Sequence, residues 1–215
     1  MKLQLALDEH KLEDALAFAE RVIDYVDIVE IGTPFVIDSG MEAVRRFKEK
    51  FPEKEILSDE KIMDGGYYES QLGFEAGAEY VTALGVSDLA TIKGCIKAAE
   101  DFNKQTVVDM ICVEDMPKRI EELEEIGAHV LAVHTGADVQ VLGRTPLDDL
   151  KVMTKYAKKA KIAVAGGINS QTINKYVELD PDIIIVGTGI TRADDPVEAA
   201  RSIKAAINEH VKAGK

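Results

Sequence analysis

Short aliphatic runs recur along the chain, and most are followed by a stretch with the apolar spacing of an amphipathic helix. The runs are apolar throughout rather than alternating, which is typical of strands buried on both faces of a parallel sheet. We predict eight strands, at Leu3–Leu7, Val26–Ile31, Glu55–Ser58, Tyr80–Ala83, Thr106–Asp109, Val130–Val133, Ile162–Ala165 and Ile183–Val186. The predicted helices between them include Leu12–Val22, Met41–Lys50, Ile92–Phe102, Pro117–Ile126 and Leu147–Ala157.

Eight strand–helix units within 215 residues favour a closed (β/α)8 barrel, the TIM barrel, over the alternative of a doubly wound open sheet. The sequence contains no Pro-, Gly- or Ser-rich linker that would divide these units. We therefore expect an α/β protein with one barrel domain over residues 1–215.

The composition excludes several classes of partner. Lys and Arg number 26 against 39 Asp and Glu, giving a net charge of −13. Binding to nucleic acid or to an anionic membrane requires clustered cations, so neither is expected. No apolar run approaches the roughly 20 residues that span a bilayer. Cys95 and Cys112 lack the spacing of a metal site and suggest reduced thiols. We expect a cytoplasmic protein.

Polar residues or glycines follow nearly all of the predicted strands. The carboxyl ends of parallel barrel strands meet on one face, where TIM-barrel active sites lie. Each such residue alone could be a helix N-cap or part of a turn, but their repeated placement predicts a site. The residues are Asp8, Glu30, Asp59, Lys61, Asp64, Asp109, His134, Gly166, Gly167 and Gly187.

The segment from Asp59 to Asp64 places two carboxylates on either side of Lys61. If the extended conformation continues, Asp59 and Lys61 project to the same side and converge on one site. A fixed ammonium there could stabilise an enolate oxygen or deliver a proton. The alternative is a surface ion pair on a loop.

Glu30 and Asp59 end neighbouring predicted strands, so their carboxylates could share a divalent ion. Ligation by oxygen alone favours Mg²⁺ over Zn²⁺. Alternatively, Glu30 pairs with Lys61.

His134 follows an apolar run and is either a hydrogen-bonded core residue or a general acid/base. The glycines after the seventh and eighth strands, with Thr188, suggest a phosphate cradle, because glycine lets backbone N–H groups approach an anion. We expect a helix N-terminus to add positive potential there. Arg144 and Arg192, in loops after the sixth and eighth strands, contact either the phosphate or only solvent.

The motif Asp59-x-Lys61-x-x-Asp64 resembles the signature of the orotidine 5′-phosphate decarboxylase superfamily. Further segments resemble its 3-hexulose-6-phosphate synthases, so that the resemblance covers essentially the whole chain. These segments are Leu3–Asp8, Val29–Pro34, Asp59–Gly66, Val108–Cys112, Ala132–Gly136 and Ala163–Ile168.

The resemblance implies a Mg²⁺-dependent aldol condensation of formaldehyde with D-ribulose 5-phosphate, giving D-arabino-hex-3-ulose 6-phosphate by formaldehyde fixation. Glu30 and Asp59 would be the metal ligands, and Lys61 would stabilise the enediolate. His134 would be the acid/base group, and Asp64 would be lent to the neighbouring subunit of a homodimer. Asp8 would bind sugar hydroxyls, and Asp109 would contact the substrate. The glycine loops would hold its phosphate.

The main alternative is a 3-keto-L-gulonate-6-phosphate decarboxylase (KGPDC), which shares the strand-three motif. That family has an arginine three residues after its strand-six histidine, whereas Ala137 stands here. Glu60 and Tyr67 replace an alanine and a histidine of the synthase pattern, with no role assigned. A non-catalytic phosphosugar-binding barrel is a more remote alternative, because it needs neither a metal pair nor a base. Orotidylate decarboxylase chemistry uses no metal and needs Asp instead of Glu30.

Overall fold

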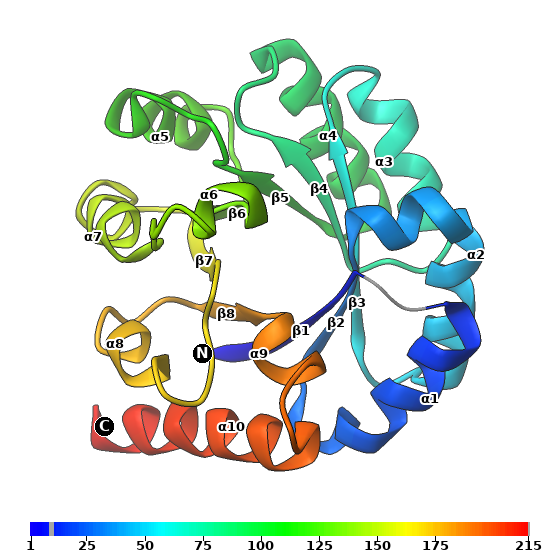
Figure 1. Cartoon of the computed structure of the whole chain (residues 1–215). Coiled ribbons are helices and arrows are strands. Elements are labelled where there is room, and N and C mark those ends of the chain that lie inside the picture. Colours follow the sequence, from blue (N-terminus) through cyan, green and yellow to red (C-terminus); the bar gives the residue numbers. More distant parts are fainter. Residues whose placement is uncertain (9–10, 215) are drawn as a thin grey trace.

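The computed structural model describes residues 1–8 and 11–214. Within them, eight parallel strands close into a barrel in which every strand pairs with its sequence neighbours and β8 returns to β1, as predicted (Figure 1). The strands are β1 (Lys2–Leu7), β2 (Ile28–Ile31), β3 (Glu55–Ile62), β4 (Tyr80–Leu84), β5 (Gln105–Asp109), β6 (Val130–His134), β7 (Lys161–Ala165) and β8 (Ile183–Val186).

Helices surround the barrel (Figure 1). They are α1 (Leu12–Val22), α2 (Thr33–Lys50), α3 (Gly66–Glu75), α4 (Leu89–Phe102), α5 (Met116–Glu125), α6 (Ala137–Gln140), α7 (Leu147–Tyr156), α8 (Ile173–Val177), α9 (Thr188–Thr191) and α10 (Pro196–Ala213), with a 3-10 turn at Ile23–Tyr25. No helix of the described chain is both long and apolar enough to cross a membrane.

Two elements differ from the predicted boundaries by four residues or more, and the others by at most three. Helix α2 begins at Thr33 rather than Met41. The helix is bent at Gly40, where φ is 58°, and the predicted helix covered only the part after this bend. Strand β3 continues to Ile62, four residues beyond its predicted end. Its register with β4 shifts between Ser58 and Ile62, and Lys61 adopts a left-handed φ of 49°. A bulge of this kind re-aims side chains at a barrel rim.

Side chains fill the half of the barrel interior that lies toward the amino ends of the strands. A layer that includes Ile28, Leu57 and Tyr80 is almost fully buried. At the amino ends of β1 and β3, the Lys2 ammonium lies 2.5 Å from a Glu55 carboxylate oxygen, and the Tyr80 hydroxyl donates to the same carboxylate at 3.3 Å. A packed core between the strands and the helices surrounds the barrel. The barrel is thus closed at the amino ends of its strands, and space remains at the carboxyl ends.

Glu60 is a half-buried acid on the outer face of β3, with one oxygen shielded from solvent. A methyl group added at Gly73 of α3 would stand 2.3 Å from Glu60 Oε1, so the carboxyl group packs directly against that helix. Oε1 has no hydrogen-bond partner among the described residues. Burial raises the pKa of Glu60 to about 7, and the charge of Glu69 adds to this shift. Ionised Glu60 therefore destabilises the fold.

Replacing this acid by its neutral isostere, Glu60→Gln, should increase stability above pH 7. The raised pKa means that the native state holds the proton more tightly than the unfolded state between about pH 4.5 and 7. The wild-type protein should lose about 3 kcal/mol of stability over this interval, and the variant should not. Urea unfolding at pH 5 and pH 8 measures the difference. Exposed Glu53→Gln is the matched control, and an equal pH dependence in Glu60→Gln and wild type would contradict the assignment.

Candidate active site

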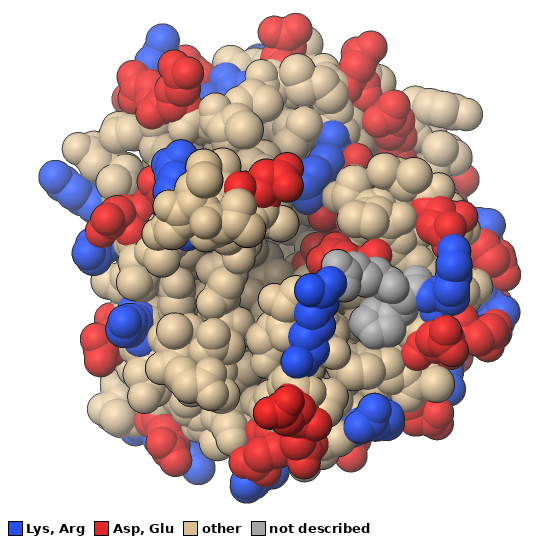
Figure 2. All heavy atoms as spheres, viewed as in Figure 1, with Lys and Arg blue, Asp and Glu red and all other residues tan. Residues whose placement is uncertain are grey.

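A cavity of about 1550 Å³ opens at the carboxyl ends of the strands. Figure 2 shows the hollow at the centre of this face, with acidic side chains at its edge. The cavity brings together most residues of the predicted site. It is lined by Asp8, Glu30, Asp59, Lys61, Asp109, His134, Gly166, Gly167, Gly187 and Thr188. Asp64 is exposed and is not one of the described residues that line it.

Lys61 is held between two carboxylates. Its Nζ lies 2.5 Å from Asp59 Oδ2 and 3.5 Å from Asp109 Oδ2. Burial alone would lower the pKa of Lys61, but the charges of Asp59 and Asp109 outweigh it and raise the pKa. Asp59 and Lys61 face the same cavity, as expected, although the left-handed φ of Lys61 interrupts the extended conformation on which that expectation was based. This ion pair is largely buried. The structure therefore excludes the alternative of a surface ion pair on a loop.

Thr82 organises this pair, and the sequence prediction missed it. Its hydroxyl donates to Asp59 Oδ1 at 2.7 Å and accepts the Lys61 backbone N–H at 2.9 Å. Thr33 donates to the other oxygen, Asp59 Oδ2, at 2.7 Å. The N–H that Thr82 binds belongs to the residue with left-handed φ, so Thr82 supports the bulge of β3. A polar residue within the apolar run of β4 was the only available signal.

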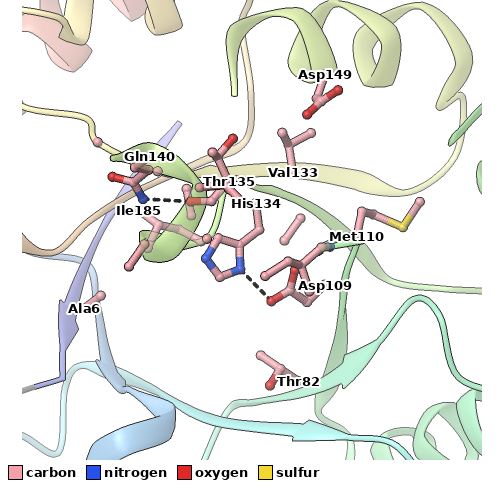
Figure 3. A pocket seen from close by; sticks show the side chains of 18 of the residues that line it. Ala6, Thr82, Asp109, Met110, Val133, His134, Thr135, Gln140, Asp149 and Ile185 are labelled. Carbon is pink, nitrogen blue, oxygen red and sulfur yellow. Dashed lines mark hydrogen bonds and ion pairs between the residues drawn. The ribbon is translucent and has the colours of Figure 1, made fainter. Parts of the chain in front are cut away.

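His134 and Asp109 form a second pair (Figure 3). The distance from His134 Nδ1 to Asp109 Oδ2 is 2.8 Å, and Asp109 Oδ1 accepts the Ile111 N–H at 2.9 Å. Burial opposes ionisation of Asp109, but the hydrogen bond and charge of His134, together with Lys61, lower its pKa. An ionised carboxylate can only accept, so Nδ1 carries the proton and Nε2 is left to act as a base.

Glu30 lies on β2 beside β3, as predicted. It accepts a 2.6 Å hydrogen bond from Gln4 Nε2, and no ion pair joins it to Lys61 among the described contacts. Burial raises the pKa of Glu30 well above its usual value, and the charges of Asp59 and Asp8 raise it further. Glu30 pairs with Leu57 in the sheet, so Asp59 lies two positions farther along the neighbouring strand.

This donor set fits a magnesium ion. No cluster of three or more potential metal-binding side chains occurs among the described residues. Mg²⁺, however, commonly binds through one or two carboxylates and completes its shell with water and substrate oxygens. A divalent ion between Glu30 and Asp59 would also offset the repulsion that raises the pKa of Glu30.

The glycine loops after β7 and β8 expose their backbone to the cavity. Gly166 and Gly167 have φ values of 128° and 67°, a region that favours glycine. The helix arrangement differs from the expectation: α8 starts only at Ile173, and α9 has four residues. No long helix N-terminus therefore adjoins these loops in the described chain, so the donors that an anion would meet there are backbone N–H groups. Of the two arginines, Arg144 lines the cavity, whereas Arg192 is not among the described lining residues.

Comparison with known proteins assigns the chain to a family. The model of the orotidine 5′-phosphate decarboxylase / HUMPS family matches residues 1–203. The chain belongs to this family. A 3-hexulose-6-phosphate synthase from Staphylococcus aureus (strain MSSA476) is 48% identical over 207 residues, covering 96% of this chain and 99% of the relative.

Solved structures of the family superpose closely on this barrel. A 3-hexulose-6-phosphate synthase from Salmonella typhimurium is 58% identical, covers 98% of this chain and 100% of its own, and has a TM-score of 0.97. A KGPDC from Streptococcus mutans, solved in complex with a pentose phosphate, is 28% identical, with 97% coverage of both chains and a TM-score of 0.89. Sequence identity is thus twice as high to the synthase as to the decarboxylase, whereas both share the fold.

Removing the Thr82 hydroxyl should destabilise this family member. Thr82→Val keeps the shape of the side chain but leaves Asp59 Oδ1 and the Lys61 N–H without this partner. Leaving buried polar groups unpaired costs about 1–3 kcal/mol, so urea unfolding should show a loss of about 2 kcal/mol. Thr82→Ser retains the hydroxyl and should lose less. Equal stability of Thr82→Val and wild type would show that the two hydrogen bonds do not support the fold.

Proposed function

We propose that the protein is a lyase of the 3-hexulose-6-phosphate synthase type. In this reaction formaldehyde and D-ribulose 5-phosphate condense reversibly to D-arabino-hex-3-ulose 6-phosphate. The observation that carries the proposal is the joint position of Lys61, between two carboxylates, and the His134–Asp109 pair in one cavity. The 58% identity to a chain named as such a synthase supports it.

The residues can perform each step of this condensation. His134 Nε2 removes a proton from C1 of the ketose, and the C1–H electron pair forms the enediolate as the C2 carbonyl becomes an oxyanion. Lys61 stabilises the negative oxygens. C1 then attacks the formaldehyde carbon, the C2 carbonyl re-forms, and the electron pair of the formaldehyde C=O moves to its oxygen. That oxygen takes up a proton, so the sum of the two substrates is the product.

The cavity also offers groups for the rest of the substrate. The backbone of Gly166, Gly167 and Gly187, with Thr188, would hold the phosphate, and Asp8 would bind sugar hydroxyls. The family structure in complex with a pentose phosphate supports a phosphosugar as the ligand. At the position where the decarboxylases have an arginine, Ala137 lines the cavity. This difference favours the synthase over the decarboxylase.

Glu30 and Asp59 would hold a magnesium ion in this proposal. When bound, the ion would act as a Lewis acid toward the vicinal oxygens of the substrate. Asp59 would keep its contacts with Thr33 and Thr82, because a carboxylate offers about four lone-pair sites. Lys61 would thus share the stabilisation of the anionic oxygens with the ion that these carboxylates would hold. The enzyme would work in the cytoplasm, in formaldehyde fixation by the ribulose monophosphate pathway.

We further propose a homodimer that shares Asp64. Asp64 is exposed beside a group of exposed apolar side chains on the β3–α3 connection and α3: Met63, Tyr67, Tyr68 and Leu72. Exposed apolar side chains gathered in this way are typical of a protein interface. In this proposal Asp64 would complete the partner's cavity, because it is not among the described residues that line the cavity of its own chain.

The purified protein should consume formaldehyde when it is given ribulose 5-phosphate and Mg²⁺, and chelation by EDTA should stop the reaction. Lys61→Ala should reduce the rate by at least about 100-fold, because it removes the cation that stabilises the enediolate. Circular dichroism checks that this variant is folded, and the exposed, distant change Lys212→Ala near the end of α10 is the control. Release of CO2 from 3-keto-L-gulonate 6-phosphate, with no Mg²⁺-dependent formaldehyde loss, would instead establish the decarboxylase.

Mixed dimers test the shared site. Asp64→Asn and Lys61→Ala should each be inactive alone. After the two are unfolded together and refolded at equal concentration, one of the two sites in each mixed dimer would contain both native residues. The mixture should recover about one quarter of wild-type activity, as expected for a symmetric dimer with random pairing. If Asp64 acts in its own subunit, no activity returns.

A further inference from the structure

The cavity extends beyond the barrel interior. Val133 lies between Ala132 and His134 on β6, and because strand side chains alternate, it faces the opposite side of the strand from His134. Val133 nevertheless lines the same cavity as His134. In Figure 3 His134 points toward Asp109, whereas Val133 points to the other side of β6, toward Asp149 on α7. The cavity therefore has a side arm, which we define by Met110, Met116, Val133, Val152 and Tyr156.

The arm lies where the chain leaves β6. The connection to β7 begins with α6, which has only four residues, and α7 begins at Leu147 after a further loop. The arm lies between the outer face of β6, the start of α5 and α7, which is the ten-residue helix of the same connection. Met116 at the start of α5, together with Val152 and Tyr156 on α7, forms the walls.

The arm has apolar walls and a charged rim. Met110, Met116 and Val133 are almost completely buried. At the outer end, Asp149 and Lys155 also line the cavity. The total volume of about 1550 Å³ exceeds the roughly 300–1,000 Å³ of most ligand pockets. A five-carbon sugar phosphate between the glycine loops and the carboxylates of β2 and β3 would leave the arm unfilled.

The proposed reaction needs a second substrate after the first has bound. The phosphosugar would occupy the barrel mouth, and the reacting C1 would lie beside His134, where the arm meets the barrel interior. An apolar passage disfavours an anionic sugar but admits a small neutral molecule. We propose that the arm is the passage and binding place for the one-carbon aldehyde, separate from the route of the sugar. This inference rests on the proposed condensation.

Narrowing the arm should slow only the reaction with formaldehyde and should leave the binding of the sugar unchanged. In Val152→Phe, kcat/KM for formaldehyde should fall at least ten-fold, while KM for ribulose 5-phosphate stays unchanged. Exchange of the C1 proton with solvent deuterium, measured without formaldehyde, should also stay at the wild-type rate, because it needs only the sugar and His134. Glu121→Phe places the same side chain at an exposed position of α5 that does not line the cavity. This variant should resemble wild type.

A reversible block keeps the test decisive if Val152→Phe does not fold. Val152→Cys is made with Cys112→Ser, since Cys112 also lines the cavity, whereas Cys95 is buried. Modification with a benzyl methanethiosulfonate should reproduce the selective loss, and a reductant should restore activity. The Cys112→Ser single variant, treated identically, is the control.

Two results would overturn the inference. One is an unchanged kcat/KM for formaldehyde in the blocked enzyme. The other is an equal loss in KM for the sugar or in C1 exchange, which would show that the arm binds the sugar. Failure of the proposed function is distinguishable from both, because the unmodified wild-type protein would then consume no formaldehyde at all.

Discussion

The ion pair of Lys61 with Asp59 and Asp109 is the interaction on which the site depends. An ammonium buried in a barrel requires neighbouring carboxylates, and their charges raise its pKa despite the burial. The geometry of β3 serves this pairing, because the bulge and the left-handed φ of Lys61 direct the side chain toward two different strands. Thr82 binds the bulge and one of the carboxylates at once.

Asp109 contacts both the lysine and the histidine of the site. One of its oxygens lies near both Lys61 Nζ and His134 Nδ1. The same carboxylate therefore helps to keep the lysine charged and fixes the tautomer of the histidine. In the proposed reaction, the cation that would stabilise the enediolate and the base that would generate it are thereby held at a fixed separation. This coupling explains why a residue expected only to contact substrate has a structural position at the centre of the site.

The strands and the active face could be predicted from sequence because they depend on local pattern. Apolar runs specify buried strands, and parallel topology then places Glu30, Asp59 and His134 on one face. Thr82 and Gln4 could not be found in this way, because a polar residue within an apolar run shows its role only when its partner on another strand is known. The bulge that extends β3 and the early start of α2 likewise depend on backbone dihedral angles and packing, which periodicity does not encode.

The side arm lies where the chain leaves β6. The connection to β7 begins with the single turn α6 and a loop, and its main helix α7 begins only at Leu147. Val133, on the outer face of β6, and residues of α7 therefore line the same cavity as His134. In the proposed reaction this space would give the neighbourhood of His134 a second approach. An enzyme that must keep an anionic intermediate enclosed while admitting another reactant gains from such a separation, because the larger substrate can remain bound while the smaller one arrives.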